Sequence, residues 1–167
     1  MASKKIMLVL PPRDFPADVC TTIRQVLAGH GHTVTATSVA RSATSDDGRS
    51  VPVDVPLKDV KTWDHDAFVF IGGEGTRLYF GDEQVIKLAK DVKYKTLGAT
   101  GNAAVILALA EALKGKRATT DTDWAQLVER HGARYTGRPL EVDDKVITLQ
   151  DAAAAEQFAN AMAKALA

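Results

Sequence analysis

The stretch that decides the fold is KTLGATGNAAVILALAEALKGKR, residues 95–117. Its pattern predicts a short buried strand, a tight turn around Gly101, and a long apolar helix that ends near Gly115. In many α/β hydrolytic folds such a turn is a nucleophile elbow, which holds a Ser or Cys above the sheet. Here the tip of the turn is Gly101, which has no side chain. The sequence therefore predicts the architecture of a nucleophilic enzyme without its nucleophile.

Strand and helix patterns alternate along the rest of the chain. Continuous apolar runs are typical of strands covered on both faces, and residues 33–38 alternate as a half-exposed strand would. The predicted strands lie near residues 5–10, 33–38, 67–71, 96–99 and 145–149. Amphipathic segments between them predict helices, and an alanine-rich helix closes the chain over residues 152–166. We therefore predict a flavodoxin-like α/β fold, a three-layer α/β/α sandwich with a mostly parallel central sheet.

The length of the chain indicates one domain over residues 1–167, and its charge balance indicates which partners to expect. A chain of this length buries roughly two thirds of its unfolded surface, and it contains no internal repeat or credible linker. Lys plus Arg equal Asp plus Glu, 21 each, and no basic run exceeds two or three residues. Because such a balance gives no long-range attraction to polyanions, we expect neither nucleic acid nor an anionic membrane surface as a partner.

The short apolar runs and the single cysteine indicate in which cellular compartment the protein is expected. The longest runs, such as residues 6–10, are too short to span a bilayer, so no membrane insertion is expected. Residues 1–5 are not followed by the apolar segment of a signal peptide. Cys20 cannot form an internal disulfide alone, and a reducing cytoplasm fits best.

Taken together, three segments resemble the ThiJ/PfpI family. They are IGGEG at 71–75, GATGNAAVILALAEALKGKRAT at 98–119 and GARYTGRPLEVDDKVIT at 132–148, and the resemblance extends over nearly the whole chain. The family includes intracellular proteases, deglycases, glyoxalases and chaperone-like proteins. The resemblance implies a fold similar to class I glutamine amidotransferases and at least a homodimer.

The family's chemistry depends on a Cys at the elbow and a Glu on the first helix that hydrogen-bonds the thiol. Matching the family pattern to this sequence places the nucleophile at Gly101 and the glutamate at Val19. The next residue, often His in the family, is Asn102. Because both reactive groups are absent, the resemblance favours a site that no longer performs thiol chemistry.

What remains at the elbow is a turn rich in backbone N–H donors. We expect Gly73 and Asn102 to aim N–H groups at a point above Gly101, where a small anion or a carbonyl compound could bind. The Gly72-Gly73 pair could equally serve only a tight turn. The expected ligand-site residues are Asp18, Gly72, Gly73, Glu74, Thr100, Gly101 and Asn102. No cofactor and no metal site are expected.

Three functional hypotheses follow. The first is a catalytically degenerate homo-oligomer that binds a small molecule or has a protective, stress-related role. The second is an active cysteine-independent hydrolase, deglycase or glyoxalase, although carboxylates and amides are poor substitutes for a thiolate. The groups that could replace the lost pair are Arg13, Asp18, Glu74, Asn102 and Asp121. The third is a redox sensor that acts through Cys20, whose apolar neighbours favour instead a buried structural thiol.

Overall fold

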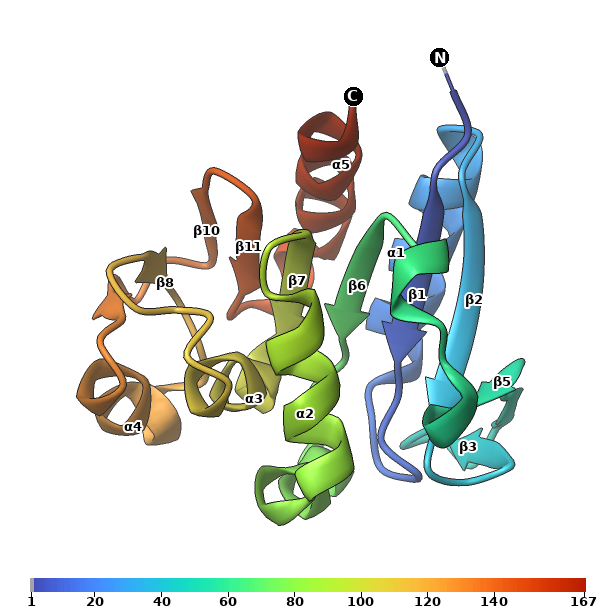
Figure 1. The fold of residues 1–167 in the computed structure, drawn as a ribbon, viewed down its shortest axis with the longest axis horizontal. Coiled ribbons are helices and arrows are strands. Elements are labelled where there is room, and N and C mark those ends of the chain that lie inside the picture. The colour runs from blue at the N-terminus through green and yellow to red at the C-terminus, as the bar shows by residue number, and fades with distance from the viewer. Residues whose placement is uncertain (1) are drawn as a thin grey trace.

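A seven-stranded sheet forms the middle layer of the computed structural model, which describes residues 2–167 (Figure 1). The strand order is β10-β11-β7-β6-β1-β2-β5, and every neighbouring pair is parallel except β10 with β11. The bounds are β1 Lys5–Val9, β2 Thr33–Ser38, β5 Val55–Pro56, β6 Ala67–Phe70, β7 Thr96–Thr100, β10 Leu140–Asp143 and β11 Val146–Leu149. All five strands predicted from the sequence are confirmed, and so is the mostly parallel sheet.

Helices cover both faces of this sheet, which confirms the three-layer α/β/α architecture (Figure 1). Successive residues of a strand point to opposite faces. In β1, Ile6 and Leu8 join the core under one pair of helices, whereas Met7 and Val9 join the core under the others. The first pair is α1 (Ala17–Gly29) with α5 (Ala155–Leu166), and the others are α2 (Glu83–Val92), α3 (Ala104–Leu109) and α4 (Ala125–Arg130).

Shorter elements connect these layers. A hairpin of β3 (Ser42–Thr44) with β4 (Ser50–Pro52) and a parallel pair of β8 (Arg117–Ala118) with β9 (Arg134–Tyr135) lie outside the main sheet. The 3₁₀ turns are η1 Leu57–Asp59, η2 Thr62–Asp64, η3 Glu74–Gly81, η4 Gly101–Ala103, η5 Thr122–Trp124 and η6 Ala152–Ala154. Over residues 2–167, none of the helices has the length and apolar character needed to cross a membrane.

The helix after the elbow is shorter than its sequence predicts. It begins as η4, and α3 ends at Leu109 rather than near Gly115. The chain reverses at Glu111, which adopts a left-handed φ of 62°, and the N–H of Ala112 donates to the Leu107 carbonyl at 2.9 Å. Leu113 is nevertheless fully buried. The apolar run extends beyond the end of α3 because the following loop also packs into the core. Apolar spacing alone does not distinguish such a buried loop from a continued helix.

The strand β2 also differs from the prediction of half exposure. Only its first residue, Thr33, is exposed, and its last three residues, Ala36 to Ser38, are all buried. The pairing of β5 with Thr37 and Ser38 covers this end of β2. The polar side chain of Thr37 thus occupies an interior position that alternation would have assigned to the surface.

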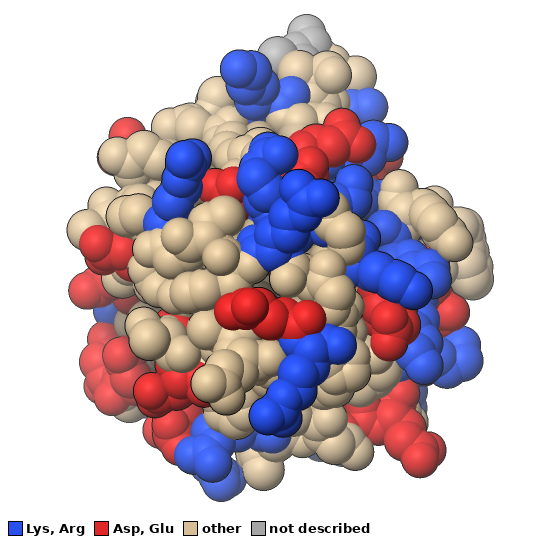
Figure 2. Space-filling model, turned by 90° about the vertical axis from the view of Figure 1, so that its left-hand side faces the viewer, with Lys and Arg blue, Asp and Glu red and all other residues tan. Residues whose placement is uncertain are grey.

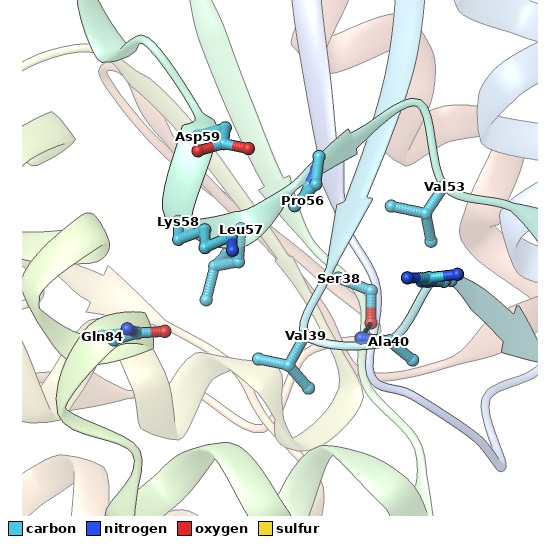
Figure 3. A pocket seen from close by; sticks show the side chains of 10 residues that line it. Ser38, Val39, Ala40, Val53, Pro56, Leu57, Lys58, Asp59 and Gln84 are labelled. Atoms are coloured by element: carbon cyan, nitrogen blue, oxygen red, sulfur yellow. Dashed lines mark hydrogen bonds between the residues drawn. The ribbon is translucent and has the colours of Figure 1, made fainter.

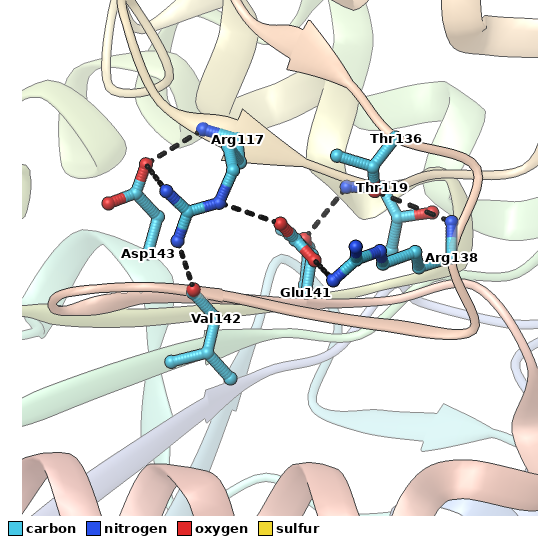
Figure 4. Close-up of polar contacts among 8 residues, drawn as sticks. Arg117, Thr119, Thr136, Arg138, Glu141, Val142 and Asp143 are labelled. Atoms are coloured by element: carbon cyan, nitrogen blue, oxygen red, sulfur yellow. Dashed lines mark hydrogen bonds and ion pairs between the residues drawn. The ribbon is translucent and has the colours of Figure 1, made fainter.

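Arg117 covers the free edge of the outermost strand, β10 (Figure 4). Its Nε donates to the buried carboxylate of Glu141 at 2.9 Å, and its Nη2 donates to the Val142 carbonyl at 2.9 Å. Its backbone N–H donates to Asp143 at 2.8 Å. Since unpaired edge groups can recruit other strands, these contacts both attach β8 to the sheet and occupy part of its edge.

Tyr79 joins the carboxyl ends of β1 and β2 from inside the protein. Its hydroxyl donates to the Leu10 carbonyl at 2.6 Å, accepts from the Val39 N–H at 3.3 Å, and lies 3.1 Å from the Ser38 hydroxyl. The side chain is 1% exposed. One phenol therefore satisfies polar groups from two neighbouring loops.

We predict that Tyr79→Phe lowers the free energy of unfolding by about 1–3 kcal/mol, because the buried Leu10 carbonyl loses its partner. Urea denaturation measures this difference. The matched control is Tyr94→Phe, at a tyrosine that is 82% exposed, which should change stability by less than about 0.5 kcal/mol. Equal effects of the two substitutions would contradict the role assigned to the Tyr79 hydroxyl.

Candidate functional site

The predicted elbow is present at the carboxyl end of β7. Thr100 ends the strand in an extended conformation, and the next residue, Gly101, has a left-handed φ of 54°. A residue with a Cβ pays roughly 1–2 kcal/mol for this conformation, whereas glycine adopts it freely. The sharp turn then leads directly into η4 and α3.

The glycine turn after β6 is clamped to this elbow by side chains. The Asn102 amide exchanges two hydrogen bonds with Gly73, accepting from its N–H at 3.0 Å and donating to its carbonyl at 2.9 Å. The Thr100 hydroxyl accepts from the Gly72 N–H at 2.9 Å. A Cβ on Gly73 would overlap the Asp14 carbonyl oxygen, so only glycine permits this approach. The turn and the elbow therefore form one rigid unit.

These bonds correct the expected anion site. The N–H groups of Gly72 and Gly73 point at protein oxygens rather than at a shared point above Gly101. The expectation that the Gly73 N–H points at a ligand above the elbow is therefore wrong, since the Asn102 side chain already accepts from it.

Asp121 occupies the region beside the elbow tip. Its carboxylate oxygens lie 3.4 and 3.5 Å from the position that a Cβ on Gly101 would take. The preceding Thr120 donates its hydroxyl to the Gly101 carbonyl at 3.0 Å, and its own carbonyl accepts from Gln150 Nε2 at 3.0 Å. Burial raises the pKa of Asp121, the nearby charge of Asp123 adds to this effect, and the Asn102 N–H opposes it.

Gly101, Val19 and Asp121 line one hollow of about 220 Å³. The remaining lining residues are Pro16, Gly72, Gly73, Thr100, Leu149, Gln150 and Ala152. Val19 is 5% exposed and reaches the hollow from α1. The two positions matched to the family's nucleophile and glutamate therefore lie around the same space. We call it the elbow hollow.

A second hollow of about 340 Å³ shares Gly73 and Asp121 with the elbow hollow. Its other lining residues are Glu74, Arg77, Asn102, Asp123 and Trp124. Glu74 forms a 2.9 Å ion pair with Arg77, whose guanidinium lies 6.0 Å from the Trp124 ring centroid. Glu74 and Asn102 thus border this second space rather than the elbow hollow.

Asp18 is the predicted site residue that the structure places elsewhere. Its side chain is fully exposed, and its nearest cation is Arg49 at 4.0 Å. The inward face of α1 carries Ala17, Val19, Cys20, Ile23 and Leu27, and Asp18 lies outside it. Arg13, another candidate, lines neither hollow and pairs with Asp14 at 3.5 Å.

Leu149 and Gln150 are site residues that the sequence reasoning missed. β11 runs parallel to β7 and pairs Leu149 with Thr100. The carboxyl ends of parallel neighbours meet at one edge of a sheet, which was the available signal. Gln150 Nε2 also donates to the Tyr135 hydroxyl at 2.8 Å, so both donors of its side-chain NH2 group are used in holding the Thr120 segment and Tyr135.

A larger hollow, about 580 Å³, lies apart from the elbow at the end of β2 (Figure 3). Its lining includes Val39, Leu57 and Gln84 but no residue of the elbow hollow. Among residues 2–167, no three His, Cys, Asp or Glu side chains gather as a metal site would require. Cys20 is buried, and burial raises its pKa, so its thiol has little of the thiolate character that redox sensing needs.

The raised pKa of Asp121 predicts a measurable pH dependence. Between the ordinary value, 3.8, and the higher folded value, the folded state binds more protons than the unfolded state. The free energy of unfolding contributed by this group therefore falls as pH rises through that window. We predict that Asp121→Asn becomes more stable relative to wild type from about pH 4 upwards. Chemical denaturation across this range tests it, with Asp59→Asn as an exposed control. A stability difference between Asp121→Asn and wild type that is independent of pH would refute the assignment.

Comparisons with known proteins agree with this geometry. The DJ-1/PfpI family model matches residues 4–165. An uncharacterized protein of Methanocaldococcus jannaschii is 29% identical over 172 residues, covering 99% of this chain and 84% of that protein. The crystal structure of a ThiJ/PfpI domain protein from Brachyspira murdochii superposes with a TM-score of 0.93 at 22% identity, covering 99% and 98% of the two chains. Drosophila melanogaster DJ-1beta gives 0.86 at 20% identity, covering 99% and 91%. Matched over nearly its whole length, this chain belongs to the DJ-1/PfpI family.

Proposed function

We propose that this chain is a non-catalytic family member that binds a small molecule in the elbow hollow. The observation that carries the proposal is the shared position of Gly101 and Val19 around that hollow. Neither residue has a group that can attack a substrate or exchange a proton. The only cysteine, Cys20, is buried and does not line the hollow.

The polar groups of the hollow favour a ligand that donates hydrogen bonds. The amides of Gly72 and Gly73 already serve protein acceptors, whereas Asp121 presents a carboxylate beside Gly101. A carboxylate repels anions and accepts from hydroxyl and amino groups. The ligand class is therefore a small alcohol, a hydrated carbonyl compound or an amine. This replaces the small anion expected from the sequence.

We also infer that the protein acts as a homo-oligomer, with a protective role in the cytoplasm. The family resemblance supports this, and Val142, 41% exposed on the edge strand β10, supplies apolar surface for a contact. Light scattering at tens of micromolar protein tests the association. A monomer under these conditions would defeat it.

We predict that neutral diols and small amines perturb the backbone NMR signals of Gly101 and Asn102, whereas acetate and phosphate do not. Asp121→Asn should abolish the preference for amines, because it removes the charge but keeps the side-chain shape. Asp59→Asn, at an exposed carboxylate outside the hollow, is the matched control. Stronger shifts with acetate than with an amine would overturn the ligand class.

We predict that the wild-type chain does not turn over methylglyoxal by thiol chemistry, and that Gly101→Cys alone restores little. The Cβ of a cysteine at this position would lie about 3.4 Å from an Asp121 carboxylate oxygen. The negative charge of Asp121 would therefore disfavour the thiolate and raise the pKa of the thiol. Adding Asp121→Asn should lower the thiol pKa, and adding Val19→Glu should raise turnover above the single variant.

The rate of thiol alkylation against pH measures the first effect, with Cys20→Ala in every variant to remove the native thiol. Robust turnover by wild type and by Cys20→Ala alike would support the cysteine-independent enzyme instead. Loss of that turnover in Asp121→Asn would then identify the carboxylate as its reactive group.

A further inference from the structure

A hollow of about 420 Å³ lies at the opposite edge of the sheet from the elbow. It is bordered by residues just before the amino ends of β7 and β11 and by the loop between α3 and β8. The residues that matter here are Lys93, Tyr94, Lys95, Lys114, Lys116 and Lys145. We call this space the lysine hollow.

The lysine hollow is strongly basic in a chain whose net charge is zero. It gathers five of the chain's 12 lysines and only two carboxylates, those of Glu111 and Asp144, a formal balance of +3. In the described part of the chain, none of the five lysines has a carboxylate at ion-pairing distance, whereas Lys5 and Lys87 do. The Lys95 ammonium donates to the His65 carbonyl at 2.9 Å, so the other four lysines are the main candidates to hold an anion. Figure 2 shows Lys and Arg side chains gathered over the upper part of the face that carries β8 and β10.

The backbone that carries these lysines is fixed by hydrogen bonds. The Lys145 carbonyl accepts from the Leu97 N–H at 2.8 Å, and the Lys116 carbonyl accepts from the Arg134 N–H at 2.8 Å. Between Lys114 and Lys116, the Gly115 N–H donates to the Gly132 carbonyl at 2.9 Å. Three separate segments therefore hold like charges around one space, so that binding an anion would require little backbone ordering.

Tyr94 adds an aromatic face to this basic site. Its side chain is 82% exposed, and the Lys93 ammonium lies 5.4 Å from its ring centroid. An exposed ring beside cations is suited to stack on a planar base while the ammonium groups hold phosphates. Burial of the ring against protein does not account for its position.

We propose that the lysine hollow binds a triphosphate chain, supplied by a nucleoside triphosphate or by inorganic triphosphate. Several neighbouring ammonium groups match several linked phosphates, whereas a single carboxylate would engage only one or two of them. The site is distinct from the elbow hollow, with which it shares no lining residue. The proposed ligand of the lysine hollow is an anion, whereas the Asp121 carboxylate disfavours anions at the elbow hollow.

Isothermal titration calorimetry tests the proposal with ATP, inorganic triphosphate and AMP, without added divalent cations. Both triphosphates should bind more tightly than AMP, and binding should weaken as ionic strength rises to about 0.15 M. Lys114→Gln/Lys145→Gln should weaken triphosphate binding by about tenfold, which is about 1.4 kcal/mol for the two lost charge pairs together. The matched control, Lys58→Gln/Lys164→Gln, removes two charges outside the lysine hollow and should leave the affinity within about twofold.

The Tyr94→Ala variant distinguishes the two sources of the triphosphate. Weaker binding of ATP to Tyr94→Ala with unchanged binding of inorganic triphosphate assigns the site to a nucleotide. Unchanged binding of both triphosphates to this variant assigns the site to the phosphate chain alone. Backbone NMR shifts at Tyr94 and Lys145 of the wild-type protein locate the ligand without any variant. Equal weakening by the two double variants, equal affinity for AMP and ATP, or no triphosphate binding at low ionic strength would each overturn the proposal.

Discussion

The pair of hydrogen bonds between the Asn102 side chain and the Gly73 backbone is the contact on which the site depends. It joins the carboxyl ends of β6 and β7, two central strands, through one amide that is 4% exposed. Gly73 in turn packs against the Asp14 carbonyl, which fixes the approach to α1. That approach sets the direction of Val19 toward the elbow. Because a buried amide that lost these partners would be left unsatisfied, the arrangement resists small shifts.

The charge beside the elbow explains why a thiolate would be poorly placed here. Asp121 comes from the segment after β8, and Thr120 and Gln150 hold that segment against Gly101. A thiolate at the elbow tip would face this carboxylate at close range in a partly buried space, where like charges interact strongly. An apolar residue at position 19 avoids adding a second acid to the hollow that Asp121 lines. The features at Gly101, Val19 and Asp121 are therefore physically consistent with one another, although they come from three separate segments.

The local sequence predicted the features that neighbouring residues determine, such as strands and the elbow turn. It did not predict contacts between segments that are far apart in the sequence. The continuous apolar runs located the parallel strands, and Gly101 marked the left-handed elbow. The end of α3 was missed because Leu113 is buried in a loop, and burial alone resembles a helix pattern. The free amides were predicted wrongly because their acceptors, on Thr100 and Asn102, lie 28 and 29 residues away. Asp18 was misplaced because only helix geometry tells which of two neighbours faces inward.

The zero net charge of the chain conceals a separation of charge between the two edges of the sheet. At the carboxyl edge, Asp121 and Asp123 border the second hollow together with Glu74, and only Arg77 balances them. At the amino edge, five lysines come from three segments of at most three residues each. No run of consecutive basic residues revealed this cluster, because the fold rather than the sequence assembles it. Fields add over distances comparable to the screening length of about 8–10 Å, so an anion near the protein is drawn to the amino edge and repelled from the elbow. The two proposed binding surfaces, one at each edge of the sheet, therefore have opposite charge preferences.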